Sequence, residues 1–294
     1  MSSVDSSGDV VARSAMHQNP TMTEDASSQA SVSRPADRWR EALLRSAVPQ
    51  TILDNAPEPE VTLEPERFRW RPEEDATQPV RPSRRRALEA LPEGGTVLDV
   101  GVGGGASSLG LVPKVGLIVG VDPMPGMLES FEASAKEVGV AVRAVLGSWP
   151  DVADEVEPAD VAVCHHAIYR VAELEDFVSA LTARARHRVV VEVSAHSPLA
   201  GLNPLWRTIH GIDRPDPLVA DEAQAVLTWM GLAVEREDIL LPPRVQEVTP
   251  QLVAFARRRL YVGPERDAEI EKFLREREPQ EQRVAALWWP GTAA

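Results

Sequence analysis

The sequence predicts an α/β fold in which a mainly parallel, doubly wound sheet carries helices on both faces. Two observations predict it. Short apolar runs alternate with segments of helical periodicity, which is typical of parallel strands joined by crossover helices. The first apolar run ends on a glycine cluster at 101–105, and the next ends on the carboxylate Asp122. Strand, glycine-rich turn, short helix, strand and terminal acid make half of a nucleotide-binding unit.

The apolar runs predict seven strands. Their expected ranges are 97–100, 116–121, 140–146, 160–164, 188–193, 233–239 and 282–289. The runs are short enough for strands rather than helices, and most are bounded by turn residues or charges.

The periodic segments between the strands predict helices. Their expected ranges are 82–91, 125–138, 174–185, 204–210, 221–230, 249–260 and 266–277. The helix at 125–138 should bury Met127, Leu128 and Phe131, and the helix at 174–185 should bury Leu174, Phe177 and Leu181. Asp221 is expected to cap the helix that Gly231 ends.

Composition limits the partners and the compartment. The chain has 294 residues, a formal net charge of −14 and one cysteine, Cys164. The acidic balance argues against binding to a nucleic-acid backbone, and a single cysteine excludes an intrachain disulfide, which fits a cytoplasmic protein. We expect no membrane association, because no apolar stretch approaches about 18 residues, and no secretory signal, because the start of the chain lacks an apolar core.

The glycine cluster alone does not identify its ligand. Gly101, Gly103 and Ala106 have the spacing of a dinucleotide-binding turn, which permits an NAD(P)-dependent oxidoreductase. Asp99, two residues before the first glycine, would repel a pyrophosphate but attract a cation. S-adenosylmethionine carries an ammonium and a sulfonium and no phosphate, so Asp99 favours it. The alternative for Asp99 is a strand-end acid that accepts hydrogen bonds from nearby amides.

The pattern Leu-Asp-Val-Gly-x-Gly-x-Gly at 98–105, followed by Val-Gly-Val-Asp at 119–122, resembles the class I S-adenosylmethionine-dependent methyltransferases. The resemblance implies a Rossmann-like methyltransferase fold of seven strands, with the last strand antiparallel between the fifth and sixth. It also implies roles for five residues. Gly101, Gly103 and Gly105 would line the cofactor, Asp99 would orient its methionine end, and Asp122 would bind its ribose.

Further cofactor-binding residues are expected at neighbouring strand ends, since ligands of doubly wound sheets lie there. They are Pro123, Met124, Ser148, Trp149 and Cys164. Many family members have an acid at the end of the third strand that binds the adenine. This chain has Ser148 and Trp149 there, so the contact is expected to pass to the Ser148 hydroxyl or to the backbone. Trp149 either covers the adenine or packs in the core.

The end of the fourth strand supplies the catalytic candidates. His165 or His166 is a candidate general base for a hydroxyl or amine acceptor, and Tyr169 is expected beside the methyl group. We predict no metal, because adjacent histidines diverge and no cysteine or acid follows at ligand spacing. His196 is a further candidate after the fifth strand, with a loop histidine bonded to the backbone as the alternative.

The domain organisation follows from these assignments. Residues 1–36 are polar and are expected to be a disordered tail. Residues 37–92 should form a helical and proline-rich extension, whose Trp39, Phe68 and Trp70 either cover the cofactor site or attach the extension to the core. Residues 93–294 form the cofactor-binding methyltransferase domain, with an inserted loop at 194–217 and a helical insertion at 243–280.

The inserted loop is expected to form one wall of the acceptor pocket. Loops of this length are usually functional or disordered, and the apolar content of this one argues against disorder. It carries Trp206, Arg207, His210 and Arg214. Arg207 or Arg214 either holds a substrate carboxylate or makes a structural ion pair.

The sequence therefore predicts a methyltransferase that uses S-adenosylmethionine and a small-molecule acceptor, whose O, N or C atom is not determined. The protein should be a monomer or homodimer. Methyl transfer needs alignment more than a dedicated nucleophile, so the chain does not reveal its acceptor. A non-catalytic S-adenosylmethionine-binding protein is the second alternative to this function, beside the oxidoreductase.

Overall fold

A computed structural model of the protein describes residues 33–58, 65–77, 79–214, 219–243 and 247–294. The predicted tail lies outside these residues except at its end, where helix α1 (Pro35–Arg45) already begins. The helix therefore starts before the predicted boundary at residue 37, with Pro35 in its first turn, where a proline needs no amide hydrogen. No helix among the described residues is both long and apolar enough to cross a bilayer.

A seven-stranded sheet forms the centre of the fold, with the order β3-β2-β1-β4-β5-β7-β6. The neighbours from β3 to β5 pair in parallel, and β7 pairs antiparallel with both β5 and β6. The strands are β1 (Gly95–Val100), β2 (Val115–Asp122), β3 (Ala141–Leu146), β4 (Ala159–His165), β5 (Ala185–Ser194), β6 (Glu235–Leu241) and β7 (Gln282–Pro290). The predicted doubly wound α/β sheet, with its last strand antiparallel between the fifth and sixth, is confirmed.

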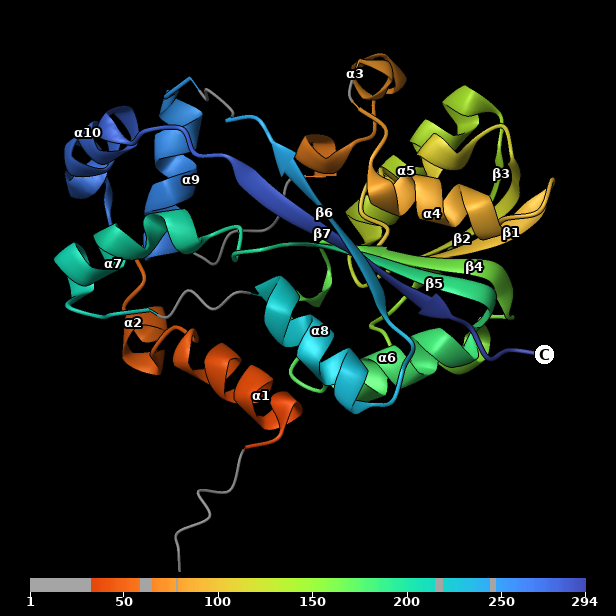
Figure 1. Ribbon diagram of the computed structural model, residues 1–294. Coiled ribbons are helices and arrows are strands. Elements are labelled where there is room, and N and C mark those ends of the chain that lie inside the picture. The colour runs from red at the N-terminus through yellow and green to blue at the C-terminus, as the bar shows by residue number, and fades with distance from the viewer. Residues whose placement is uncertain (1–32, 59–64, 78, 215–218, 244–246) are drawn as a thin grey trace, which may run out of the picture. The chain divides into compact units, whose positions relative to one another are not determined.

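Helices cover the two faces of the sheet separately (Figure 1). Helices α4 (Pro82–Ala90) and α5 (Pro125–Val138) lie on one face, and α6 (Leu174–Ala183) and α8 (Val219–Trp229) lie on the other, with α1 against α8. The apolar residues predicted to face the sheet from α5 and α6 are buried. Each face therefore has its own hydrophobic core.

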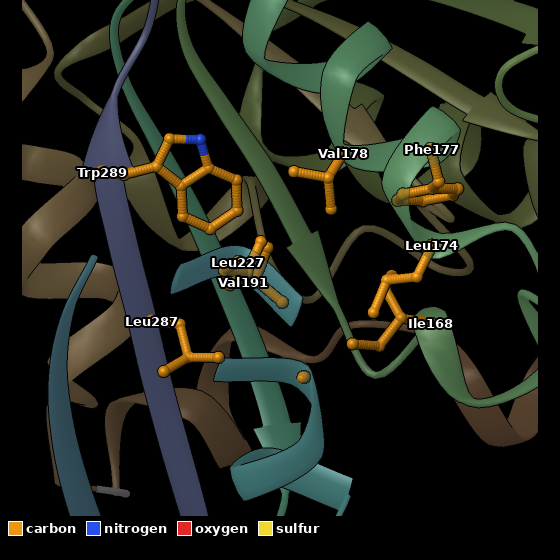
Figure 2. A pocket seen from close by; sticks show the side chains of 9 residues that line it. Ile168, Leu174, Phe177, Val178, Val191, Leu227, Leu287 and Trp289 are labelled. Carbon is orange, nitrogen blue, oxygen red and sulfur yellow. The ribbon is translucent and has the colours of Figure 1, made fainter. Parts of the chain in front are cut away.

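The face under α6 and α8 is closely packed. Figure 2 shows a small space on this face that is lined by apolar side chains, including Val191, Leu227 and Trp289. Its volume of about 10 Å³ leaves room for one water molecule at most, and its lining is apolar. This space is therefore a packing gap and not a site for a small-molecule ligand.

A third hydrophobic cluster lies apart from the sheet and is formed by helices that follow the ends of β5 and β6 in the chain. It joins α7 (Asn203–His210), α9 (Pro250–Leu260) and α10 (Asp267–Glu276), around Trp206, Leu260 and Ile270. Ile52 of the short helix α2 (Gln50–Asp54) packs against the same cluster. We call these four helices the helical cap.

Several local predictions were wrong. The connection from β1 to β2 has no α-helix after its glycine turn, only the 3₁₀ turn η2 (Leu109–Leu111). The connection spans residues 101–114 only, and the glycine turn occupies its first part. Helix α8 starts at Val219, so Asp221 lies in its first turn and not at its cap. The prolines between the first helix and residue 82 predict an extended passage there, but the structure has η1 (Pro65–Phe68) and α3 (Pro72–Ala76), since proline is well suited to the first turn of a helix.

Candidate active site

Two loops meet at the edge of the sheet where β1 and β4 end. Gly101, directly after β1, has a φ of +73°, and a Cβ placed on it would lie 2.4 Å from the Cβ of Ala167 in the loop after β4. Both the backbone conformation and the close approach require glycine. The contact holds the glycine loop, residues 101–105, against the loop that carries the catalytic candidates.

Asp99 is fully buried beneath the glycine loop. Its Oδ2 accepts hydrogen bonds of 2.6 Å from the hydroxyls of Ser107 and Ser108, while Oδ1 has no partner among the described residues. Burial raises the pKa of Asp99 to about 6, against the two hydrogen bonds, which lower it. The predicted alternative, a strand-end acid capping amides, does not match these serine partners. A buried oxygen without a partner is expected where a ligand supplies one.

Asp122 ends β2 beside the glycine loop. Its Oδ2 accepts a 3.1 Å hydrogen bond from the amide of Gly103, and its Oδ1 accepts a 2.9 Å bond from the amide of Met124. Burial raises the pKa of Asp122, against these two bonds. Each carboxylate oxygen can accept a second hydrogen bond. Pro123 lies between the two contacts and is exposed.

At the end of β3, the two residues that were predicted to contact the adenine differ in exposure. Ser148 is exposed at the strand end. Trp149 is buried, and its indole N–H donates a 3.1 Å hydrogen bond to the carbonyl of Phe177 in α6. Of the two alternatives for Trp149, the structure shows packing against α6, which leaves Ser148 as the polar side chain at this corner.

A segment of the extension, residues 65–71, lies on the glycine loop, and we call it the strap. Arg69 forms a parallel bridge with Gly104, and the amide of Trp70 donates a 3.4 Å hydrogen bond to the Gly104 carbonyl. A Cβ on Gly104 would lie 2.1 Å from the carbonyl oxygen of Phe68. Arg69 also pairs with Glu137 of α5. The backbone of the extension thus contacts the loop directly, whereas Trp39 in α1 bonds to the carbonyl of Val171.

The loop after β4 joins three polar side chains into one chain of hydrogen bonds. The Nε2 of His166 lies 3.0 Å from Oε1 of Glu192 at the end of β5, and its Nδ1 lies 2.8 Å from the hydroxyl of Tyr169. The amide of Ser194 donates a 2.7 Å bond to the same hydroxyl. His166 has a φ of +55°, a left-handed conformation that costs about 1 to 3 kcal/mol outside glycine. Such strain persists where several contacts fix the residue.

Glu192 is the buried centre of this chain. It is 2% exposed, and it accepts a 2.6 Å bond from Arg81 and another bond from the Ser83 hydroxyl, both at the start of α4. Burial by itself raises the pKa of Glu192, but the His166 bond and the nearby positive charges hold that pKa far below its usual range. Glu192 is therefore an anion that can only accept hydrogen bonds.

Of the two other candidates at the end of β4, Cys164 is buried and His165 is half-buried. Burial lowers the pKa of His165 to about 4, and its Nε2 has no hydrogen-bond partner in the described part of the chain. His165 is therefore neutral and a weak base at neutral pH. Burial raises the pKa of the Cys164 thiol, whose side chain belongs to the core under α6.

The predicted acceptor wall belongs to the helical cap. Arg207 pairs with Asp213, and Arg214 lies over the Trp206 ring and donates to the carbonyl of Ser46. His210 bonds to the carbonyl of Leu260. Arg207 thus makes the ion pair predicted as its structural alternative, whereas Arg214 contacts a carbonyl and an aromatic ring and not a carboxylate. His196 is exposed after β5, and part of the inserted loop, residues 215–217, lies outside the described residues.

Sequence reasoning missed Glu192, Arg81 and Ser83. Glu192 carried the same signal as Asp99, because each is a lone acid inside an apolar strand, in Val189 to Val193 and in Val97 to Val100. A buried charge needs partners, so this pattern was the signal from which a polar cluster at the end of β5 could have been predicted. Arg81 and Ser83 had no comparable signal, since only the packing of α4 brings them there.

The strand-end groups fit S-adenosylmethionine. Asp99 offers an unpartnered carboxylate oxygen for an ammonium, and Asp122 retains acceptor capacity for a ribose diol at the end of β2. No group of three or more histidine, cysteine, aspartate or glutamate side chains within the described ranges could hold a metal ion.

Comparison with known proteins gives a family for this part of the chain. Residues 97–188 match the family model described as a methyltransferase domain. A ubiquinone biosynthesis O-methyltransferase of Azorhizobium caulinodans is 28% identical over 170 residues, covering 58% of this chain and 62% of that protein. This chain thus matches about three fifths of the length of the curated relative.

Solved structures of similar architecture include three proteins. YcgJ from Bacillus subtilis is 19% identical with a TM-score of 0.49, covering 72% of this chain and 99% of that one. A methyltransferase from Thiobacillus denitrificans, in complex with S-adenosyl-L-homocysteine, is 20% identical with a TM-score of 0.46, covering 82% and 98%. The magnesium protoporphyrin IX methyltransferase of Synechocystis PCC 6803 is 14% identical with a TM-score of 0.47, covering 86% and 93%.

Proposed function

We propose that this chain, a member of the class I S-adenosylmethionine-dependent methyltransferases, transfers the methyl group of S-adenosylmethionine to a small-molecule acceptor. The observation that carries the proposal is Asp99, a buried carboxylate under the glycine loop with one oxygen unpartnered. A dinucleotide pyrophosphate would be repelled there, whereas the ammonium of the methyl donor would be attracted. The relative named as an O-methyltransferase also supports a small-molecule acceptor.

Three residues would each bind a different part of the donor. Asp99 would hold the ammonium of the donor, Asp122 the ribose, and Ser148 the adenine edge. The bound donor supplies a methyl carbon activated by the adjacent sulfonium. The protein then has to align the acceptor with that carbon and exclude water, and such alignment corresponds to effective molarities of roughly 10⁵–10⁸ M. The strap on the glycine loop and the loop after β4 are placed to exclude water.

Isothermal titration with S-adenosylhomocysteine and, separately, with NADH tests the cofactor. We expect S-adenosylhomocysteine to bind and NADH not to bind. Binding of NADH alone would refute the proposal in favour of an oxidoreductase.

A labelling screen tests the reaction. The full chain is incubated with radiolabelled donor and a cell extract, and labelled products are separated by size. We expect label in small molecules. Donor binding without any labelled product would support a non-catalytic binding protein instead.

We further propose a cytoplasmic monomer or homodimer that does not bind nucleic acid. The single cysteine supports the compartment, and the net charge of −14 supports the lack of nucleic-acid binding. Sedimentation of the full chain, alone and with duplex DNA, tests both the oligomeric state and the nucleic-acid binding.

A further inference from the structure

We infer that Tyr169, His166 and Glu192 form a proton-accepting chain, and that the acceptor presents an ionisable hydroxyl to Tyr169. The inference rests on the proposed function and goes beyond it by naming the acceptor's functional group and the residues that deprotonate it. Glu192 and Arg81 act as positioning residues, because they touch His166 or its partner and not the acceptor.

The direction of the hydrogen bonds follows from the charge of Glu192. An ionised carboxylate only accepts, so the Nε2 of His166, at 3.0 Å, must carry a proton and donate it. In a neutral imidazole the other nitrogen, Nδ1, is then an acceptor. It lies 2.8 Å from the hydroxyl of Tyr169, which must donate to it. The Tyr169 oxygen meanwhile accepts from the amide of Ser194.

The same atomic positions also suit the three hydrogen-bonded side chains after they have taken up a proton. When an acceptor hydroxyl attacks the methyl carbon, its O–H bond breaks as the new C–O bond forms and the bond from carbon to sulfur breaks. The proton passes to the Tyr169 oxygen, and the proton already on Tyr169 passes to Nδ1 of His166. His166 becomes an imidazolium that donates to both Tyr169 and Glu192, so no heavy atom has to move.

The surroundings favour this role over simple packing. Glu192 is 2% exposed and the His166 side chain is 40% exposed, so the imidazole bonds to a buried anion while part of its side chain stays accessible to solvent. Arg81 and Ser83 each donate one further hydrogen bond to Glu192 and fix its orientation. The strained backbone of His166 and the bond of its amide to the carbonyl of Glu192, at 2.8 Å, hold the ring at the strand end.

The location points to the acceptor side of the site. Ala167, next to His166, contacts Gly101 of the glycine loop. The chain of hydrogen bonds therefore lies beside the loop that would hold the methyl donor. A hydroxyl is the acceptor that needs a base here, because a neutral alcohol or phenol is a weak nucleophile until its proton leaves.

The test compares two hydroxyl acceptors of different acidity. Methyl transfer from labelled donor is measured with catechol, with the more acidic 4-nitrocatechol, which is largely ionised in neutral solution, and with the amine analogue o-phenylenediamine. The variants are Tyr169→Phe, His166→Gln and Glu192→Gln. The control is Tyr261→Phe, the only other tyrosine of the chain, which belongs to the helical cap.

We expect each of the three variants to methylate catechol about 100-fold more slowly or worse, the usual effect of losing a general base. With 4-nitrocatechol the loss should be less than 10-fold, because this acceptor needs no base. The control should match the wild type on both. Equal losses on both catechols, no loss on either, or methylation of the amine alone would overturn the inference.

Two further measurements do not depend on turnover. Each variant is titrated with S-adenosylhomocysteine, and unchanged affinity shows that it has folded. If the wild type itself does not bind S-adenosylhomocysteine, the proposed function fails, whereas a wild type that binds it but shows the wrong catechol pattern fails the inference alone. Nitrogen NMR of the His166 ring should place its proton on Nε2, and a proton found on Nδ1 alone would also overturn the inference.

Discussion

The ends of β1 and β2 build their half of the site from neighbours in the chain, whereas the ends of β4 and β5 build theirs from distant segments. Asp99, the glycine loop and Asp122 lie within one strand-turn-strand unit. Glu192, by contrast, meets His166 from the previous strand and Arg81 from the extension. The first half therefore forms a motif that a sequence displays, and the second half exists only in the folded chain.

The two halves also differ in how they treat a buried carboxylate. Asp99 has two serine hydroxyls and no cation, and burial raises its pKa to about 6. Glu192 has Arg81 and the imidazole of His166, and its pKa is held well below the usual range. A buried carboxylate that has no cation beside it can bind the cationic group of a ligand. A buried carboxylate that already accepts hydrogen bonds from several side chains fixes the orientation of those side chains.

The largest expected effect concerns donor binding at Asp99. Replacing Asp99→Asn keeps the shape and removes the charge that would pair with the ammonium. We expect affinity for S-adenosylhomocysteine to fall by about 3 kcal/mol, or roughly 100-fold. Isothermal titration measures it, with Asp238→Asn on the far edge strand β6 as the control. Unchanged affinity of the Asp99 variant would show that the donor binds elsewhere.

The same variant should change how the stability of the ligand-free protein depends on pH. The pKa of Asp99 is about 6 in the folded protein against an ordinary 3.8, so the folded state holds the proton more tightly. The free energy of unfolding should therefore fall as pH rises from about 4 to about 6, by about 3 kcal/mol in total, and stay low above that range.

The Asp99→Asn variant has no carboxyl group at this position, so its free energy of unfolding should not show this fall with pH. Its free energy of unfolding relative to wild type should increase by that amount between pH 4 and pH 7, as urea titrations at both values can measure. A difference that does not vary with pH would mean that Asp99 titrates normally.

An intermediate effect is expected where the strap meets the glycine loop. In Gly104→Ala the new Cβ would lie 2.1 Å from the Phe68 carbonyl oxygen, so the strap backbone must move. We expect a loss of about 1 to 3 kcal/mol of unfolding free energy. In the matched variant Gly126→Ala, the nearest atom is a Pro65 ring carbon at 3.0 Å, which can shift, so its loss should be smaller. Equal stability of the two variants would argue against the strap contact.

The smallest effects should separate Ser148 from Trp149. Trp149→Phe removes the bond to the Phe177 carbonyl and should cost about 1 kcal/mol of stability without changing affinity for S-adenosylhomocysteine. Ser148→Ala should do the reverse, lowering affinity by about 0.5 to 1.5 kcal/mol at constant stability. Loss of affinity in the Trp149 variant alone would place its ring against the adenine.

The sequence by itself determined where the strands lie along the chain, the glycine turn and the two acids Asp99 and Asp122. These features follow from local composition and spacing, because an apolar run of strand length and a glycine cluster have few other interpretations. Even the helix that is missing after the glycine turn concerns only the short stretch 106–114.

Only the tertiary structure decided how Arg81, His166, Tyr169 and Glu192 come together. It also decided how each tryptophan packs. The separation of those four residues in the chain leaves no periodic signal, since the contacts depend on the strand order and on the packing of α4 against β5. The two lone acids looked alike in the sequence. In the fold, Asp99 lies beside two serine hydroxyls and keeps one oxygen unpartnered among the described residues, whereas Glu192 lies beside Arg81 and His166 and orients the histidine.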